Sequence, residues 1–74
     1  MLDKLFAFAK KLSKPSTFQV KYRLNANGVE MVYVYACINI NGKWHTYEKQ
    51  MSLKGMEEKQ EEVINDIIKN TFEN

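Results

Sequence analysis

The sequence contains very little cysteine, histidine or proline: its 74 residues include one of each. The single cysteine, Cys37, cannot form a disulfide within the chain, and a free cysteine between apolar neighbours is typical of a reducing compartment. One cysteine and one histidine also fall short of the four ligands of a structural zinc site. We therefore expect a cytoplasmic protein with no disulfide within the chain and no metal site.

Long apolar runs are absent as well. No segment approaches the ~20 consecutive apolar residues that a membrane-spanning helix needs. The apolar stretch from Leu5 to Ala9 is too short for the core of a signal peptide, and lysines follow it instead of preceding it. We therefore expect no membrane span, in agreement with a cytoplasmic location.

The chain offers no set of side chains suited to catalysis. Cys37 and His45 are the only nucleophile–base pair of this type, and the strand pairing derived below places them on opposite faces of a sheet. The three glycines fall at two predicted turns and at a helix entry, so none belongs to a phosphate-binding loop. The paired carboxylates lie on a predicted exposed helix face, where nothing apolar would raise their pKa. The sequence thus predicts a protein that is not an enzyme, with no cofactor and no small-molecule substrate.

Two Asn-Gly pairs, Asn27-Gly28 and Asn41-Gly42, are the most informative feature that is present. Asn-Gly between runs of alternating apolar residues is the strongest short-range signal for a β-hairpin. The pairs divide the middle of the chain into three strands, at about residues 17–24, 29–40 and 43–52, which form an antiparallel meander. Helical patterns lie on either side, at about residues 3–13 and 55–72. We predict one small α+β domain over residues 1–74, in the order α-β-β-β-α, with the C-terminal helix packed on one face of the sheet.

Both predicted helices are amphipathic. Asp3 is a candidate N-cap of the first helix, and Pro15 is expected to end it. Ser52 is a candidate cap of the second helix, whose apolar stripe consists of Met56, Val63, Ile64, Ile67, Ile68 and Phe72. The acidic residues of that helix are interpreted as its solvent-exposed side: Glu57, Glu58, Glu61 and Glu62.

The register of the sheet follows from the turns. A two-residue turn at Asn41-Gly42 pairs Ile40 with Lys43 and makes the even positions of residues 32–40, all apolar, the core side. The apolar positions of the first strand join that side only if the first loop has an odd number of residues, because a slip of one residue moves every side chain to the other face. We therefore predict a three-residue loop, 26–28, with Gly28 in the left-handed position of a bulge. This loop pairs Phe18 with Ala36, Val20 with Val34, and Tyr22 with Val32.

This register divides the strand residues between two faces. The predicted core face collects Phe18, Val20, Tyr22, Val32, Val34, Ala36, Ile38, Ile40, Tyr47 and Met51. Lys49 also falls on the core side, where its stem is expected to reach solvent from an edge strand and to discourage strand addition. The opposite face presents Gln19, Lys21, Arg23, Met31, Tyr33, Tyr35, Cys37, Asn39, Trp44, Thr46, Glu48 and Gln50.

The second face is the candidate binding surface, and three interpretations of it stay open. The first helix covers it, a protein partner or a second copy binds it, or its aromatic and basic side chains bind nucleic acid. The preferred hypothesis is a non-catalytic interaction module, an accessory regulator or inhibitor, that binds a protein or forms a homodimer. Its predicted binding residues are Lys21, Arg23, Met31, Tyr33, Tyr35 and Trp44. The nucleic-acid alternative uses Lys21, Arg23, Lys43 and the same aromatic residues.

Two further patterns bear on the partner and the source. Residues 1–49 hold eight Lys or Arg against three Asp or Glu, and a basic half can attract anionic partners, although segregated charge is also typical of an ordinary soluble surface. Ten lysines to one arginine, with seven asparagines, suit an A+T-rich genome such as that of a phage or prophage.

The element order resembles that of the double-stranded-RNA-binding domain across nearly the whole chain. That family carries a basic cluster at the start of its last helix, which meets phosphates across a groove. Here the corresponding segment is Gly55-Met56-Glu57-Glu58-Lys59, followed by Glu61 and Glu62, and this negative charge would repel phosphates. The family's binding mode therefore does not carry over. Three strands followed by a helix are also similar to the arm-binding domains of phage integrases, which insert a sheet into a DNA groove.

Overall fold

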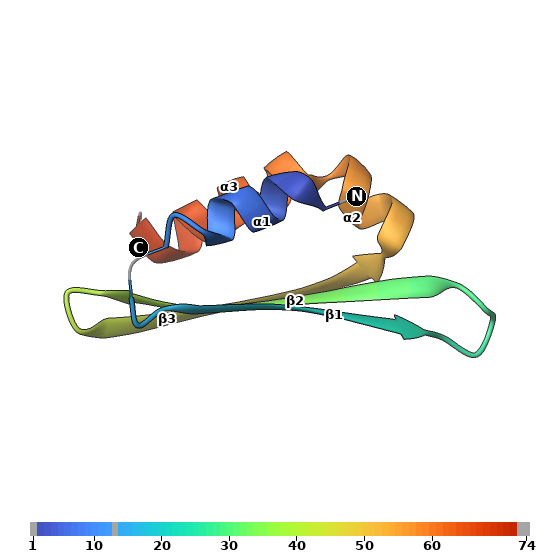
Figure 1. Ribbon diagram of the computed structural model, residues 1–74, viewed down its shortest axis with the longest axis horizontal. Coiled ribbons are helices and arrows are strands. Elements are labelled where there is room, and N and C mark those ends of the chain that lie inside the picture. The colour runs from blue at the N-terminus through green and yellow to red at the C-terminus, as the bar shows by residue number, and fades with distance from the viewer. Residues whose placement is uncertain (1, 13, 73–74) are drawn as a thin grey trace.

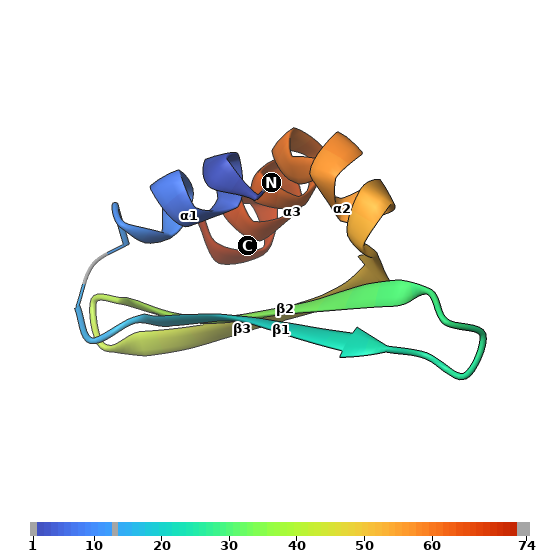
Figure 2. The same cartoon turned by 45° about the vertical axis from the view of Figure 1, so that its right-hand side comes forward.

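The computed structural model describes residues 2–12 and 14–72 of the chain. Its elements run in the order α1 (Asp3–Ala9), β1 (Thr17–Leu24), β2 (Glu30–Ile40), β3 (Lys43–Ser52), α2 (Leu53–Glu58) and α3 (Gln60–Phe72). The strands form one antiparallel sheet in the order β1-β2-β3, and the helices of the described residues all lie on the same face of it (Figure 1, Figure 2). The predicted α+β layout is confirmed.

The two turns have the geometry that sets the predicted register. Asn41 and Gly42 both have positive φ, 53° and 83°, which is the conformation of a two-residue type I′ turn. In the first loop, the N–H of Gly28 donates to the C=O of Asn25 and the N–H of Asn25 donates to the C=O of Val29, both at 3.0 Å. Gly28 has φ 79°, as the left-handed position of a three-residue loop requires. The pairing of Phe18 with Ala36, Val20 with Val34 and Tyr22 with Val32 is confirmed.

The core lies between the sheet and the helices. It consists of the even positions from 32 to 38 of β2 together with Leu2 and residues from each helix: Leu2, Leu5, Val32, Val34, Ala36, Ile38, Met56, Val63 and Ile67. Helix α1 packs over the β1 side, where the rings of Phe8 and Phe18 meet edge to face with centroids 6.5 Å apart. The apolar stripe of α1 is therefore used on the same side of the sheet as α3.

Three residues predicted on the core side remain exposed. Tyr22 is 57% exposed, because the β1–β2 hairpin extends beyond the helices at its turn end (Figure 1). Phe72 is 55% exposed, because the side of α3 that faces the sheet runs through Val63, Ile67 and Thr71. Lys49 starts from the core side of edge strand β3 and is exposed, as predicted.

The predicted helix bounds need two corrections. Helix α1 ends at Ala9 and not near residue 13, since Lys11 and Leu12 make tighter i→i−3 backbone bonds to Phe8 and Ala9. Its N-cap is Leu2, without a side-chain bond, so the prediction that Asp3 caps it is wrong.

The C-terminal helix is also divided. It breaks at Lys59 (φ −112°, ψ 20°) into α2 and α3. Ser52 caps α2 as predicted, because its Oγ accepts from the N–H of Gly55 at 3.1 Å.

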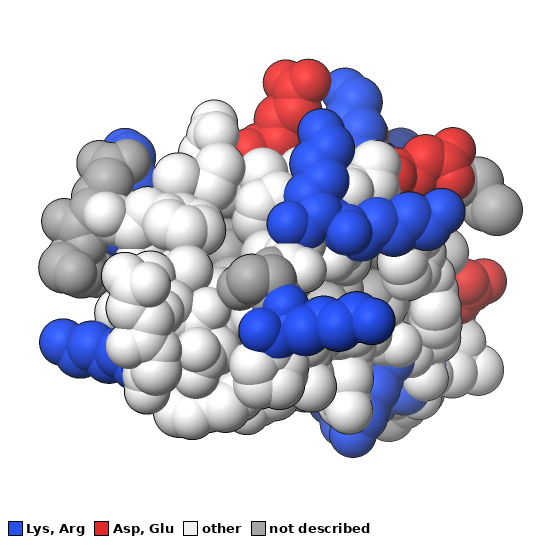
Figure 3. Space-filling model, turned by 60° about the vertical axis from the view of Figure 1, so that its left-hand side comes forward, with Lys and Arg blue, Asp and Glu red and all other residues white. Residues whose placement is uncertain are grey.

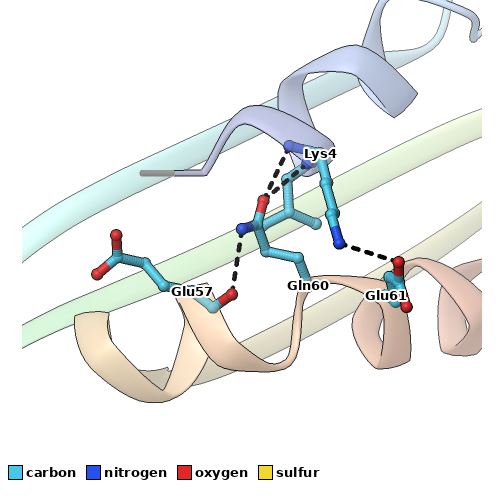
Figure 4. A network of polar contacts seen from close by, with 5 residues as sticks. Lys4, Glu57, Gln60 and Glu61 are labelled. Carbon is cyan, nitrogen blue, oxygen red and sulfur yellow. Dashed lines mark hydrogen bonds and ion pairs between the residues drawn. The ribbon is translucent and has the colours of Figure 1, made fainter.

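Gln60, at the break between α2 and α3, supplies the cap that α1 lacks (Figure 4). Its side chain is buried, and its Oε1 accepts from the backbone N–H of Lys4 at 2.9 Å and of Leu5 at 3.2 Å. Its Nε2 donates to the C=O of Glu57 at 3.1 Å. Lys4 Nζ also forms an ion pair with Glu61 at 2.9 Å. These bonds join the start of α1 to α3 and hold both helices on one face.

Candidate functional site

The side of the sheet away from the helices, called the outer face here, is not covered by any described element (Figure 2). The interpretation in which the first helix covers it is therefore wrong: Leu5 of α1 is buried in the core on the other side. The registers of both strand pairs arrange the outer-face residues in rows across the sheet. From the β1–β2 loop onward the rows are Arg23–Met31–Ser52, Lys21–Tyr33–Gln50, Gln19–Tyr35–Glu48, Thr17–Cys37–Thr46 and Asn39–Trp44.

The first two rows enclose a groove of about 300 Å³. It is lined by four of the six predicted binding residues and by one residue outside that set: Lys21, Arg23, Met31, Tyr33 and Gln50. Sequence reasoning placed Gln50 on this face but not in the site. The signal that could have found it is the strand register, which places Gln50 on β3 directly opposite Tyr33 on β2.

The two tyrosines occupy the middle strand and are half-buried between neighbouring side chains. Tyr33 donates a hydrogen bond from its hydroxyl to the carboxylate of Glu48 on β3. This bond, more than desolvation, raises the pKa of Tyr33. The pKa of Tyr35 is also raised, first by hydrogen bonding with the Cys37 thiol. Both tyrosines are therefore neutral at physiological pH and present rigid rings with a polar tip.

The cations of the outer face lie along β1. Lys21 and Arg23 are exposed and are two positions apart, so they lie on the same side of the strand. Within the described ranges neither forms an ion pair. The carboxylate of Glu48 lies on β3, on the other side of the middle strand, and accepts a hydrogen bond from Tyr33. One margin of the face is thus basic, the centre is aromatic and the far margin carries a carboxylate.

Three residues proposed for binding do not line the groove: Tyr35, in the next row of the sheet, Trp44 and Lys43. Trp44 is 50% exposed on the outer face, but it pairs with Asn39, four positions along β2 from Tyr35. At ~3.3 Å per residue this places the Trp44 and Tyr35 backbones roughly 13 Å apart along the strand. Lys43 pairs with Ile40 and lies on the helix side of the sheet, so its assignment to the nucleic-acid alternative is wrong.

The strand register keeps the two candidate catalytic side chains, Cys37 and His45, apart. Cys37 pairs with Thr46 and His45 pairs with Ile38, which confirms that the cysteine and the histidine lie on opposite faces. In the part of the chain that the structure describes, no three His, Cys, Asp or Glu side chains come together as a metal site would require. Among the same residues, no helix has the length and apolar character needed to cross a bilayer.

Comparison of the chain with models of protein families, with curated proteins and with solved structures found no match. The interpretation of the outer face therefore depends on its own residues. Those residues combine a groove, two neutral tyrosines and two cations that have no ion-pair partner among the residues that the structure describes.

Proposed function

We propose that this protein is a small non-catalytic module that binds a protein partner through the outer face and acts as an accessory regulator or inhibitor. One observation carries the proposal: the helices pack on a single face of the sheet (Figure 1), and the strand register leaves Tyr33 and Tyr35 at the centre of the uncovered outer face. Tyr, Met and Arg are enriched at the centres of protein interfaces, where rigid aromatic rings contribute much of the binding energy. The groove beside Tyr33 supplies a concave site for an anchoring side chain.

The charge of the outer face favours a protein partner over nucleic acid. A phosphate backbone that crosses the face would meet two cations on β1 and then the carboxylate of Glu48 on β3. In the view of Figure 3 the Lys and Arg side chains form separate groups and not one continuous stripe. Affinity for nucleic acid depends on the neutralisation of many phosphates, and this face supplies few cations for it.

A photo-crosslinking amino acid at position 33 tests the proposal directly. In a lysate of the source cell, we expect a discrete protein adduct that an excess of the unmodified protein abolishes and that a Tyr33→Ser/Tyr35→Ser competitor does not abolish. The control carries the same crosslinker at Phe72, which is 55% exposed at the end of α3 on the helix side of the molecule and should give no competed adduct. Equal adducts at both positions, or adducts to nucleic acid at position 33, would contradict the proposal.

Salt dependence separates the proposed partner from the nucleic-acid alternative. Binding through phosphates weakens log-linearly and steeply with salt concentration, whereas an apolar and aromatic protein interface changes little. We expect the competed complex to persist at high salt. A Lys21→Ala/Arg23→Ala variant whose complex keeps the same weak dependence on salt would further exclude a phosphate-binding role for these two side chains.

A further inference from the structure

The outward edge of β1 carries backbone groups that no other described segment uses. In an antiparallel pair, bonded and non-bonded residue pairs alternate. Asn25 and Val29 form a bonded pair, so the odd residues of β1 bond to β2. The N–H and C=O groups of the even residues therefore point away from the sheet; these residues are Phe18, Val20, Tyr22 and Leu24. Within the described part of the chain, nothing hydrogen-bonds to them from outside the sheet.

The other edge of the sheet is partly occupied. On β3 the C=O of Thr46 points outward and accepts a hydrogen bond of 2.9 Å from Nδ2 of Asn70, at the end of α3. Lys49 on the same strand adds a charge on the helix side, which disfavours an added strand. Strand addition is thus directed to β1.

The side chains of β1 define what an added strand must carry. On the helix side, Tyr22 and Leu24 are 57% and 67% exposed, and the hairpin there extends beyond the helix layer (Figure 1). On the outer side, Lys21 and Arg23 have no ion-pair partner among the described residues. A strand beside β1 would therefore meet apolar surface on one side and two cations on the other.

We propose that the β1 edge binds an extended segment of the protein partner in which acidic and apolar residues alternate. This inference rests on the proposed function, because it names the chemistry of that partner. Main-chain hydrogen bonds to the even residues of β1 hold the segment, and alternate side chains provide its specificity. The acidic side chains lie beside Lys21 and Arg23, and the apolar ones cover Tyr22 and Leu24.

Charge complementarity favours such a foreign segment over a second copy of this chain. Antiparallel pairing of two β1 strands centred on Lys21 places Lys21 opposite its own copy, and pairing centred on Tyr22 places Lys21 opposite Arg23. Pairing centred on Val20 avoids directly opposed cations but leaves Lys21 diagonal to its own copy. Like charges opposite each other on a sheet are destabilising, and diagonal neighbours are also within reach of long side chains.

The test is an NMR titration with a blocked synthetic peptide of alternating glutamate and valine. We expect the largest amide shifts at Phe18, Val20, Tyr22 and Leu24, together with slower hydrogen exchange of the same amides. A matched peptide with lysine in place of glutamate should bind at least about tenfold more weakly. A Lys21→Glu/Arg23→Glu variant should reverse this preference, which separates loss of charge from loss of folding.

Backbone methylation of the peptide separates strand addition from charge attraction alone. Methyl groups on the peptide nitrogens that face β1 should abolish binding, and methyl groups on the alternate nitrogens should leave it intact. Equal binding of the two charge forms, shifts outside β1, no shift at millimolar peptide, or a β1–β1 dimer in the absence of peptide would overturn the inference. If the competed adduct at position 33 persists in any of these cases, only the edge inference fails; if that adduct is also absent, the proposed function fails with it.

Discussion

Replacement of Gln60 by methionine should destabilise the protein more than any exposed substitution on α3. Methionine preserves the length and volume of the side chain but removes its oxygen and its N–H donors. The change leaves the backbone N–H of Lys4 and of Leu5 without their acceptor, and the C=O of Glu57 without this donor. Leu5 lies in the fully buried core, so water cannot readily replace its lost partner.

The magnitude follows from these three groups. A buried donor left unsatisfied costs about 1–3 kcal/mol, and loss of a helix N-cap typically costs about 1 kcal/mol. Because the N–H of Lys4 is only partly buried, we expect a total loss of about 2–3 kcal/mol in the free energy of unfolding. A domain of this size has a margin of only about 3–5 kcal/mol. The variant should therefore be close to its unfolding midpoint, with Tm lower by about 10–20 °C.

Urea denaturation followed by circular dichroism measures this loss, and Asn65→Met is the matched control. Asn65 is exposed on the same helix, so its substitution should change the free energy of unfolding by less than about 0.5 kcal/mol. Hydrogen exchange should also become faster at Lys4 and Leu5 before it does so in β2, because α1 loses its link to α3. A Gln60→Met protein as stable as the Asn65→Met control would refute the capping role.

Three further predictions concern a turn and two side-chain pairs. Gly28→Ala should lower the free energy of unfolding, measured by urea denaturation, by about 1–2 kcal/mol. The space around Gly28 is open, but its φ of 79° is strained for a residue with a Cβ. An unchanged denaturation midpoint would argue against the bulge. Glu48→Gln should lower the pKa of Tyr33 toward its ordinary value in an NMR titration of the ring carbons, since the hydrogen bond to Glu48 is the main cause of its elevation. The hydrogen bond from Lys4 lowers the pKa of Glu61. This pair therefore stabilises the fold fully at pH values above the ordinary glutamate pKa, and its contribution is lost as the pH falls from about 5 through the lowered pKa. Lys4→Gln should remove that part of the acid sensitivity, and an unchanged pH profile would contradict the assignment.

The sheet could be predicted from the sequence because two independent patterns agree on it. The Asn-Gly pairs indicate where the chain turns, and the alternation of apolar residues on β2 decides which loop length puts Phe18 and Val20 on the same side. The position of Lys43 on the helix side follows from the same register, so its assignment to the nucleic-acid site was avoidable. The separation of Trp44 from Tyr35 could likewise have been read from the strand pairing.

The positions of the helices could not be predicted in the same way. The amphipathic stripe of α1 suits either face of the sheet, and the outer face is aromatic enough to have received it. The residue that decides between the faces, Gln60, is polar and looks like an ordinary solvent-exposed position in a helical pattern. Its role depends on the break at Lys59 and on contacts with a segment more than fifty residues away in the chain. Such a long-range cap has no local sequence signal.

A methyl NOESY spectrum shows whether α1 and α3 share one face of the sheet and leave the other open. We expect cross-peaks from the Leu5 methyl groups to those of the buried β2 residues Val32, Val34 and Ile38, and none from α1 to the rings of Tyr33 and Tyr35. Cross-peaks between the Leu5 methyl groups and either tyrosine ring would contradict this arrangement, because α1 would then cover the proposed binding surface.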